Sequence, residues 1–440
     1  MLKKKLSVIM TAIMICSFAA CNSQETLTST DSSTLISANQ SAVDSDASST
    51  QSSVNSKATN SSTLNTDSQI KNTGKTSSDS VSASAEVTSV NADSTELFSS
   101  RDLEQTADTG SAVTITAQDN KNETITSEGV YILTGTASNF TVRVEADKES
   151  KIQLVLDGLI VTNSDFPVIY VVSADKCFIT TTNSTNTLSV TGNFKADGET
   201  NTDAVIYSKD DIVFNGTGTL NITSSGNCIS GKDDVKFTGG TYNIESTLDS
   251  IEANDSILIY DGTFNITSAK DGFHSENSDD DSVGSIYIKS GSFTVRAASD
   301  AIQAMTLCQI DGGTFELTGT EGIEATCIQI NDGSITINAS DDGINGAQKS
   351  KSYGTPTIEI NGGYVKVTVG QGDTDGIDCN GNIIVNGGTI DITAQMSSFD
   401  YDGTAQYNGG TIIINGTQVD SIPQSMMGGG MRGRGSFGRM

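Results

Sequence analysis

The sequence has no tryptophan, three prolines and a single histidine, His274. Most metal sites built from several histidines are therefore excluded, and a Ser-His-Asp hydrolase could use only His274. Basic residues are also scarce, since 25 Lys and Arg stand against 54 Asp and Glu, giving a formal charge of −29. A surface of this sign repels nucleic acid, so we expect no nucleic-acid partner.

Cysteine is sparse beyond the N-terminal leader, and no two cysteines have CxxC spacing. An odd number remains once Cys16 and Cys21 are set aside, so at least one thiol is unpaired. Packing as buried thiols is the expected state of this group. Its members are Cys177, Cys228, Cys308, Cys327 and Cys379.

One unit repeats from Asp211 to Gly416. It consists of two alternating apolar residues, a corner glycine, two more alternating apolar residues and then Asp-Gly-Ile or a close variant. Successive corner glycines are separated by 20 to 30 residues, most often 22. Repeats of this length indicate a stacked architecture. The corner glycines are Gly218, Gly240, Gly262, Gly291, Gly313, Gly333, Gly363, Gly388 and Gly410.

This repeat predicts an all-β fold, a right-handed single-stranded parallel β-helix with about 22 residues per turn. Each unit holds three short runs of period two and no helix-length pattern, so one face of every run points inward. A β-sandwich is the alternative, but its strands recur every 8–12 residues. The β-helix predicts one inward-facing column of side chains, formed by Ile257, Ile286, Cys308, Ile328, Ile358 and Ile383.

Composition divides the chain into four segments. Residues 1–20 are typical of an export signal, with three lysines before a short apolar run. Cys21 follows two alanines and is the predicted lipidation site, which gives a membrane-anchored lipoprotein at the cell surface; an ordinary secretory signal is the alternative. Residues 21–108 are predicted to be a disordered, Ser/Thr-rich spacer, 109–420 the β-helix, and 421–440 a disordered Gly/Met/Arg tail.

Carboxylates recur at the Asp-Gly-Ile position of each turn. If turns stack about 4.8 Å apart, neighbouring carboxylates repel one another. They either accept hydrogen bonds from corner backbone N–H groups while staying solvated, or hold divalent cations between turns. Oxygen ligands without histidine or cysteine favour Ca²⁺. The predicted calcium ligands are Asp271, Asp342, Asp375 and Asp378.

Three residues after each of these positions stands an outward polar side chain. Two long units insert extra residues after this point, one containing Asp279–Asp281 and the other Lys349 to Tyr353. We expect the insertions to wall a groove whose floor is the outward column, although tolerated surface insertions are an equal alternative. The predicted carbohydrate-binding residues are His274, Gln303, Glu324 and Asn345.

Several motifs carry a resemblance to a known family: Leu154-Val155-Leu156-Asp157-Gly158, Lys270-Asp271-Gly272-Phe273-His274-Ser275, Glu321-Gly322-Ile323-Glu324 and Asp341-Asp342-Gly343-Ile344-Asn345. From about Val113 to Gly416 the chain resembles bacterial exported carbohydrate-binding β-helix proteins. That family is similar in fold to pectate lyases and is associated with cellulose and acidic-sugar polymers, with bound calcium. The resemblance implies polysaccharide binding, and it does not place the ligand.

Binding without catalysis is the predicted function. A lyase needs a basic residue to take the proton beside a uronate carboxylate, and no Lys or Arg of the repeat stands in a recognisable catalytic motif. A calcium-dependent polysaccharide lyase is nevertheless the first alternative. The second is a purely structural surface stalk. Polysaccharide is the expected partner, and the membrane is contacted only through the lipid on Cys21.

Overall fold

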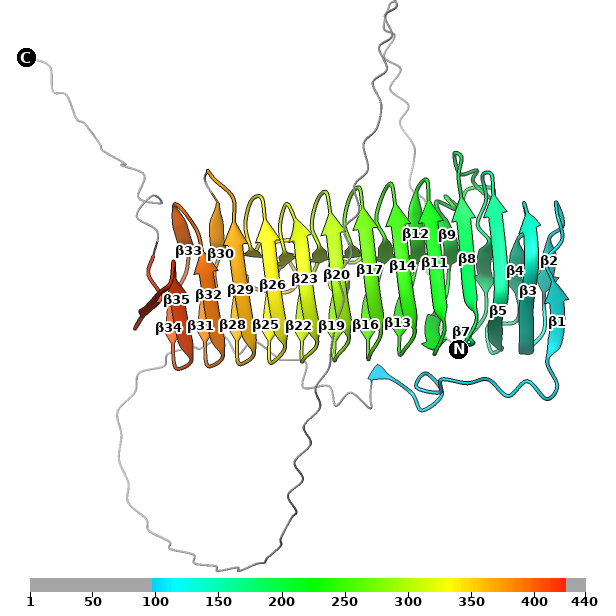
Figure 1. Ribbon diagram of the computed structural model, residues 1–440, viewed down its shortest axis with the longest axis horizontal. Helices are drawn as coiled ribbons and strands as arrows, with labels where there is room; N and C mark the ends of the chain where they lie inside the picture. The colour runs from blue at the N-terminus through cyan, green and yellow to red at the C-terminus, as the bar shows by residue number, and fades with distance from the viewer. Residues whose placement is uncertain (1–96, 373, 425–440) are drawn as a thin grey trace, which may run out of the picture. The chain divides into compact units, whose positions relative to one another are not determined.

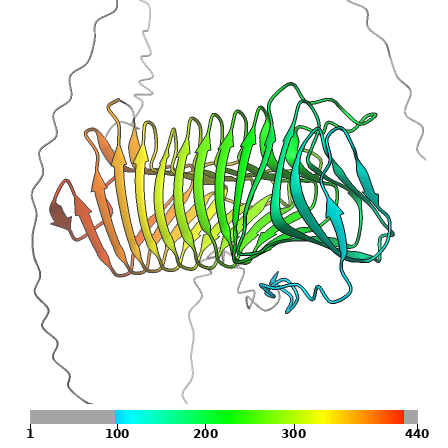
Figure 2. The ribbon, with the colours of Figure 1, turned by 45° about the vertical axis from the view of Figure 1, so that its right-hand side comes forward.

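The computed structural model describes residues 97–372 and 374–424, and these form a parallel β-helix. Figure 1 shows strands of successive turns side by side along the coil, and Figure 2 shows the same stacking from another side. The leader, Cys21, most of the predicted spacer and residues 425–440 lie outside the described residues. No helix among residues 97–372 and 374–424 is long and apolar enough to cross a membrane.

Each turn holds three strands, as the repeat predicts. The first belongs to a 12-stranded sheet, here called sheet B, whose neighbours pair in parallel at one-turn intervals. Its strands are β2 (Glu123–Ile125), β4 (Val142–Glu145), β6 (Ile169–Ser173), β9 (Ala204–Ser208), β12 (Asn227–Gly231), β15 (Ile251–Ala253), β18 (Phe273–Ser275), β21 (Ile302–Ala304), β24 (Ile323–Ala325), β27 (Ile344–Gly346), β30 (Asp375–Cys379) and β33 (Ser397–Tyr401).

The second strand of each turn precedes the glycine corner and lies in a 24-stranded sheet. We call these the pre-corner strands. β3 and β5 are long enough to continue past the corner. The pre-corner strands are β1 (Val113–Thr116), β3 (Gly129–Ser138), β5 (Lys151–Asn163), β7 (Lys176–Thr181), β10 (Ile212–Gly216), β13 (Asp234–Phe237), β16 (Ser256–Ile259), β19 (Ser285–Ile288), β22 (Leu307–Ile310), β25 (Cys327–Ile330), β28 (Thr357–Ile360), β31 (Asn382–Val385) and β34 (Ala405–Tyr407).

The third strand follows the corner and belongs to the same large sheet. The coil ends where β36 (Thr417–Val419) folds back antiparallel on β35. The post-corner strands are β8 (Thr185–Val190), β11 (Thr219–Ser224), β14 (Thr241–Ser246), β17 (Thr263–Ser268), β20 (Ser292–Ala297), β23 (Thr314–Gly319), β26 (Ser334–Ala339), β29 (Tyr364–Val369), β32 (Thr389–Thr393) and β35 (Thr411–Ile414).

The predicted inward column is confirmed. Its six members pair in register on successive pre-corner strands, from Ile257 with Ile286 to Ile358 with Ile383, and all are at most 1% exposed. Behind the corner, rings stack in the same way, with centroids of Phe264 and Phe293 5.0 Å apart and of Phe293 and Phe315 4.4 Å apart. Each turn thus contributes one residue to the same inward position, and the core is filled by columns of similar side chains in contact.

The five cysteines among the described residues are buried and form no disulfide, which confirms the expected packed thiols. Glycine is required at the corners for two separate physical reasons. Eight of the nine corner glycines have positive φ, which suits glycine. Gly218 does not, and it is required instead because a Cβ there would lie 1.6 Å from the carbonyl oxygen of Thr182.

The boundary predicted at residue 108 is too late, because residues 97–105 already pack on the coil. Phe98 is 2% exposed, and its ring lies 5.5 Å from that of Tyr260. The Gln105 side chain donates a hydrogen bond to the Thr238 carbonyl and accepts one from the Gly216 N–H. This segment, called the strap, lies along the lower edge of the coil in Figure 1. The buried Phe98 ring and the hydrogen bonds of Gln105 together hold this otherwise polar segment on the coil.

Candidate functional site

Sheet B presents a polar column outward along the coil. Side chains at the next-to-last position of its strands pair in register from turn to turn, for example Glu252 with His274 and Glu324 with Asn345. The column contains the four predicted carbohydrate-binding residues, as expected. From β12 onward its members are Ser230, Glu252, His274, Gln303, Glu324, Asn345, Asp378 and Asp400.

A second column occupies the corner that precedes each strand of sheet B. There a carboxylate oxygen accepts a hydrogen bond from the backbone N–H of the equivalent residue one turn further on, at 2.9 Å between Asp271 and Asp300 and 2.8 Å between Asp342 and Asp375. The expected backbone hydrogen bonds are therefore present. The expected solvation is wrong for Asp249, Asp271 and Asp300, which are 1–8% exposed, because the bonded chain of the next turn covers them.

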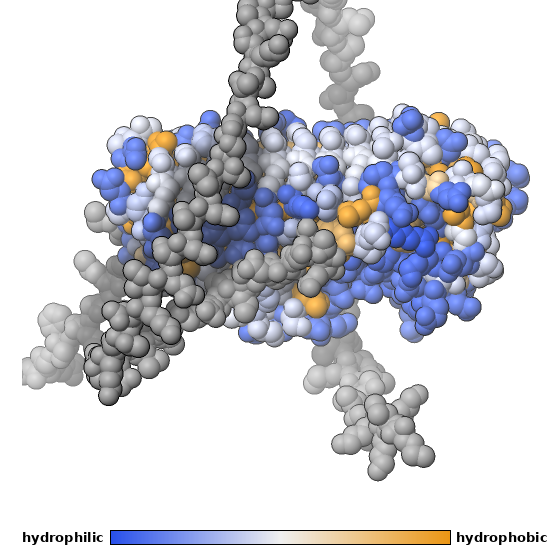
Figure 3. Space-filling model, turned by 90° about the horizontal axis from the view of Figure 1, so that it is seen from below, coloured by the Kyte–Doolittle hydropathy of each residue, from blue (hydrophilic) through white to orange (hydrophobic). Residues whose placement is uncertain are grey.

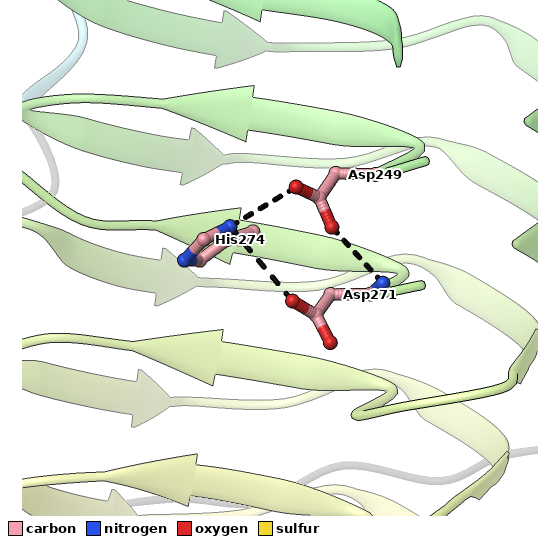
Figure 4. Close-up of side chains that lie close together, drawn as sticks. All are labelled: Asp249, Asp271 and His274. Carbon is pink, nitrogen blue, oxygen red and sulfur yellow. Dashed lines mark hydrogen bonds and ion pairs between the residues drawn. The ribbon is translucent and has the colours of Figure 1, made fainter. Parts of the chain in front are cut away.

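Three groups of side chains bring their ligand atoms within 4.8 Å of one another. The first consists of Asp249, Asp271 and His274, drawn in Figure 4. His274 Nδ1 lies 3.2 Å from Asp249 Oδ2 and 3.8 Å from Asp271 Oδ2, and Lys270 Nζ lies 2.7 Å from Asp249 Oδ2. A lysine and a histidine thus already supply positive charge to this cluster.

Charges in the first cluster stabilise one another. Burial alone would raise the pKa of Asp249, but hydrogen bonds from His274 and Lys270 lower it to about 2. Burial alone would lower the pKa of His274, but the hydrogen bond and charge of Asp249 raise it above the ordinary histidine value. Lys270 responds in the same way, and its pKa is raised. Of the predicted calcium ligands, Asp271 is therefore the one least in need of a cation.

The second cluster is Asp300, Glu321 and Glu324. Lys349, from the second insertion, reaches Glu324 with 2.5 Å between Nζ and Oε2. Asn345 Nδ2 donates to Glu321 Oε1 at 2.9 Å. Burial, with the charges of neighbouring carboxylates, raises the pKa of Asp300 to about 7 and that of Glu321 to about 8. One lysine does not balance three carboxylates, so this cluster holds protons near neutral pH.

The third cluster is Asp375, Asp378 and Asp400. Burial raises the pKa of Asp378 to about 7, and the carboxylates of Asp342, Asp375 and Asp400 add to the shift. Asp342 also accepts a hydrogen bond from the backbone N–H of Asp375. Two of the four predicted calcium ligands, Asp375 and Asp378, therefore belong to this cluster, and a third, Asp342, contacts it through the backbone of Asp375. These oxygens are hard ligands of the kind that calcium takes in proteins, so the residues present fit a calcium ion.

Asp400 completes the third cluster and was missed by the motif search. It stands in Ser-Phe-Asp, without the Asp-Gly-Ile signature, but it lies 22 residues after Asp378, which is the usual spacing of one turn. Counting by that spacing would have found it. Lys270 was also missed as a partner of the column, because a lysine beside an aspartate in sequence does not reveal which turn its side chain reaches.

The two insertions were expected to stand apart as the walls of a groove. Instead, they contact each other. They connect β18 to β19 and β27 to β28. The carboxylate and backbone carbonyl of Asp281 in the first insertion accept hydrogen bonds from Ser350, Lys351 and Ser352 in the second. Complementary polar groups at loops three turns apart favour this contact over two open walls. The second insertion also places Lys349 against the column at Glu324.

Comparison with known proteins gives two relatives. The chain is 37% identical over 198 residues to a protein from Acetivibrio thermocellus described as carbohydrate-binding domain-containing, covering 44% of this chain and 69% of that protein. It also resembles a solved structure described as the polysaccharide lyase-like protein from C. thermocellum, gadolinium derivative. That likeness has 25% identity and a TM-score of 0.41, and it covers 51% of this chain and 93% of the other.

A family profile matches a larger part of the sequence. Residues 119–376 and 325–421 match the family described as carbohydrate-binding domain-containing protein. The two matches together cover nearly all of the coil, including every strand of sheet B and all three clusters. The chain therefore belongs to the family of carbohydrate-binding domain-containing proteins.

Proposed function

We propose that this chain binds polysaccharide along the outward column of sheet B without cleaving it, and that calcium at the third cluster helps to hold acidic sugars there. The observation that supports this most is the convergence of the carboxylates of Asp375, Asp378 and Asp400. Together with burial, the carboxylates of Asp342, Asp375 and Asp400 raise the pKa of Asp378. A cation there would offset their repulsion and could also bind a sugar carboxylate.

The glycan contacts are assigned to His274, Gln303, Glu324 and Asn345. They follow one another in register along the coil, so a chain of sugar hydroxyls lying parallel to the axis would meet a polar group at each turn. Gln303 lies between His274 and Glu324 in the column, and its amide would offer a hydroxyl both a donor and an acceptor. Tryptophan is absent, so polar contacts replace ring stacking.

A non-catalytic role is supported by the state of the nearby bases. Lys270 is paired with Asp249 and Lys349 with Glu324, at 2.7 and 2.5 Å. The raised pKa of Lys270 keeps its side chain in the protonated ammonium form, which cannot take a proton from a substrate. A calcium-dependent polysaccharide lyase would need one of these lysines to be released from its carboxylate when substrate binds.

Export and anchoring complete the proposal. The leader and Cys21 give an extracellular lipoprotein, and the spacer before the strap carries the coil away from the membrane. These assignments rest on the sequence, since residues 1–96 lie outside the described part of the chain.

Retention of the protein in gels containing polygalacturonate, cellulose derivatives or no glycan would test the function, each with calcium and with chelator. We expect polygalacturonate to retain the wild type in calcium, and chelator or Asp378→Asn to release it. Gln303→Ala should weaken retention by both glycans, while Thr318→Ala on an exposed strand position is the control. Retention that ignores chelator and all column variants would place the glycan elsewhere, and no retention at all would favour a stalk. Release of unsaturated sugar products would favour the lyase.

A further inference from the structure

A cavity of about 450 Å³ lies away from the sheet B column, beside the pre-corner strands β16, β19 and β22. Leu258, Tyr287 and Leu307 form its apolar wall. Its volume is within the range of about 300–1,000 Å³ that is usual for small-molecule sites. Figure 3, which views the coil from below, shows small hydrophobic areas among mostly hydrophilic residues.

Three segments distant in sequence enclose this cavity. Leu97 comes from the strap, Ser282 and Val283 from the first insertion and Tyr353 from the second. The contacts of Asp281 with Ser350 and Ser352 hold the two insertions together. Phe98 packs beside Tyr287, with ring centroids 6.4 Å apart. The cavity is therefore assembled by the irregular parts of the chain, which the repeat itself does not require.

A buried acceptor in the cavity lacks a donor. Gln309 is 5% exposed and lines the cavity. Its Nε2 donates to Asp311 Oδ1 at 2.9 Å, which fixes the orientation of the amide, and its Oε1 is buried without a hydrogen-bond partner among the described residues. A buried acceptor left unsatisfied destabilises the folded chain. A ligand that donates a hydrogen bond would satisfy it.

The opposite end of the cavity is acidic. Asp233, Asp234 and Asp255 line it, and Lys236 Nζ lies 3.5 Å from Asp234 Oδ2. Burial raises the pKa of Asp233 to about 6, and the carboxylates of Asp211, Asp234 and Asp255 contribute to the shift. A positive charge in the ligand would relieve this repulsion.

We propose that this cavity binds an amine-bearing sugar unit. The ring of this unit would lie against Tyr287 and Tyr353 with its ammonium group facing Asp233 and Asp255. A hydroxyl of a neighbouring unit of the same oligosaccharide would donate to Gln309 Oε1, which lies two to three turns further along the coil. Aromatic walls with a few polar groups are usual in sites that take hydroxylated rings. The site is separate from the proposed calcium cluster, so it does not depend on that proposal.

Three other occupants fit less well. A bare divalent cation needs converging oxygens, and Asp233, Asp234 and Asp255 are not among the described groups whose ligand atoms lie within 4.8 Å. A uronate would be repelled by the same carboxylates. Residues 76–96, which precede the strap, contain four acidic residues and no basic one, so their charge also opposes entry.

Calorimetry on the full chain in chelator tests this assignment, with β-1,4-linked trimers of glucosamine, N-acetylglucosamine and glucose and with the α-1,4-linked trimer of galacturonate. We expect the glucosamine trimer to bind and the N-acetylated trimer, which lacks the charge, to bind at least about 10-fold more weakly. Asp233→Asn and Gln309→Leu should each weaken the glucosamine trimer about 10-fold. Melting curves check that both variants fold. Tyr353→Ala removes a cavity-lining ring from the second insertion and leaves the strands of the coil unchanged, so it should weaken binding without unfolding the chain.

Asp375→Asn serves as the control, because its cluster lies on sheet B and should leave this binding unchanged. Equal binding of the glucose trimer and the glucosamine trimer would overturn the charge assignment. Binding that survives Asp233→Asn and Tyr353→Ala but is lost in Asp375→Asn would place the amine on sheet B, and would equally overturn the proposal. Failure of the calcium-dependent retention described above would leave this result unaffected.

Discussion

His274 on β18 places its Nδ1 3.2 Å from Oδ2 of Asp249, one turn earlier in the coil. The only histidine of the chain is thus an ion-pair partner inside the polar column, held by a carboxylate from a neighbouring turn. Its Nε2 faces Glu276 at 3.3 Å, so both ring nitrogens lie beside carboxylates. This relationship makes part of the stability of the coil dependent on pH.

The pair predicts a defined pH window. The pKa of His274 is raised in the folded chain. The charged imidazole therefore contributes its full stabilisation of the fold below about pH 6.5, and this contribution is lost as the pH rises through the pKa of His274 in the folded chain. Asp249, with a pKa lowered to about 2, keeps its charge in most acid conditions. We expect His274→Gln to cost about 1–2 kcal/mol near pH 5 and less at pH 8. Denaturant unfolding at both pH values measures this, and an equal cost at both would contradict the charged pair.

The second cluster predicts the opposite response to a substitution. Glu321 has a pKa raised to about 8, so the wild type loses stability as the pH rises from about 4.5 to 8 and the carboxylate is forced to ionise. Glu321→Gln removes that charge and keeps an acceptor for Asn345. We expect its melting temperature to exceed that of the wild type at pH 9 and to match it at pH 5. A lower melting temperature at pH 9 would show that the ionised carboxylate has a cationic partner.

Calcium should change the pH dependence of the third cluster. Asp378 has a pKa raised to about 7, so without metal the folded chain loses stability as the pH rises from about 4 through 7. A cation bound there would favour the ionised form, raise the melting temperature by mass action and release protons. Thermal melts with and without millimolar calcium at pH 6 and 8 test this, with the largest increase expected at pH 8.

The double variant Asp342→Asn with Asp375→Asn should reduce the calcium-induced increase in melting temperature while the metal-free coil stays folded. Asp271→Asn is the matched comparison, since Lys270 and His274 already supply charge to its cluster. If calcium raises the melting temperatures of the wild type, the double variant and Asp271→Asn equally, the ion binds outside the third cluster. Calorimetry that detects no calcium binding to the wild type would remove the metal from the proposal.

The inward column gives a direct test of the fold. Ile328 is 1% exposed between Cys308 and Ile358, so Ile328→Asp leaves a buried charge without a partner and should cost about 3–5 kcal/mol. The control is Thr318→Asp, an exposed position of β23 that lies opposite Arg296. Urea unfolding followed by circular dichroism should show a large loss for the first variant and almost none for the second.

Lipid attachment can be tested independently of the coil. Metabolic labelling with a tagged fatty acid should mark the wild type and miss Cys21→Ser, because the lipidated residue of such a leader is the cysteine after its small residues. Equal labelling of the two proteins would reject the anchor. Secretion of an unlabelled wild type into the medium would favour the ordinary export signal.

Much of this architecture follows from the sequence alone. Alternation of apolar residues fixes which side chains face inward, and the recurrence of a corner glycine about every 22 residues fixes which residues of successive turns lie side by side. These are local and periodic properties, so the column of Ile257, Ile286 and Cys308 and the outward column of His274, Gln303 and Glu324 could both be predicted. Any one-residue error in register would have exchanged the two faces.

The tertiary structure decided what repetition does not encode. Lys270 and Lys349 reach carboxylates of other turns, so the first two clusters carry counter-charge that spacing could not assign, whereas the third gathers carboxylates and includes Asp400. The insertions contact each other through Asp281, and Phe98 binds a polar segment to the coil. Each of these depends on the path of a long side chain or an irregular loop, which is selected by complementary charge and burial among distant residues and leaves no period in the sequence.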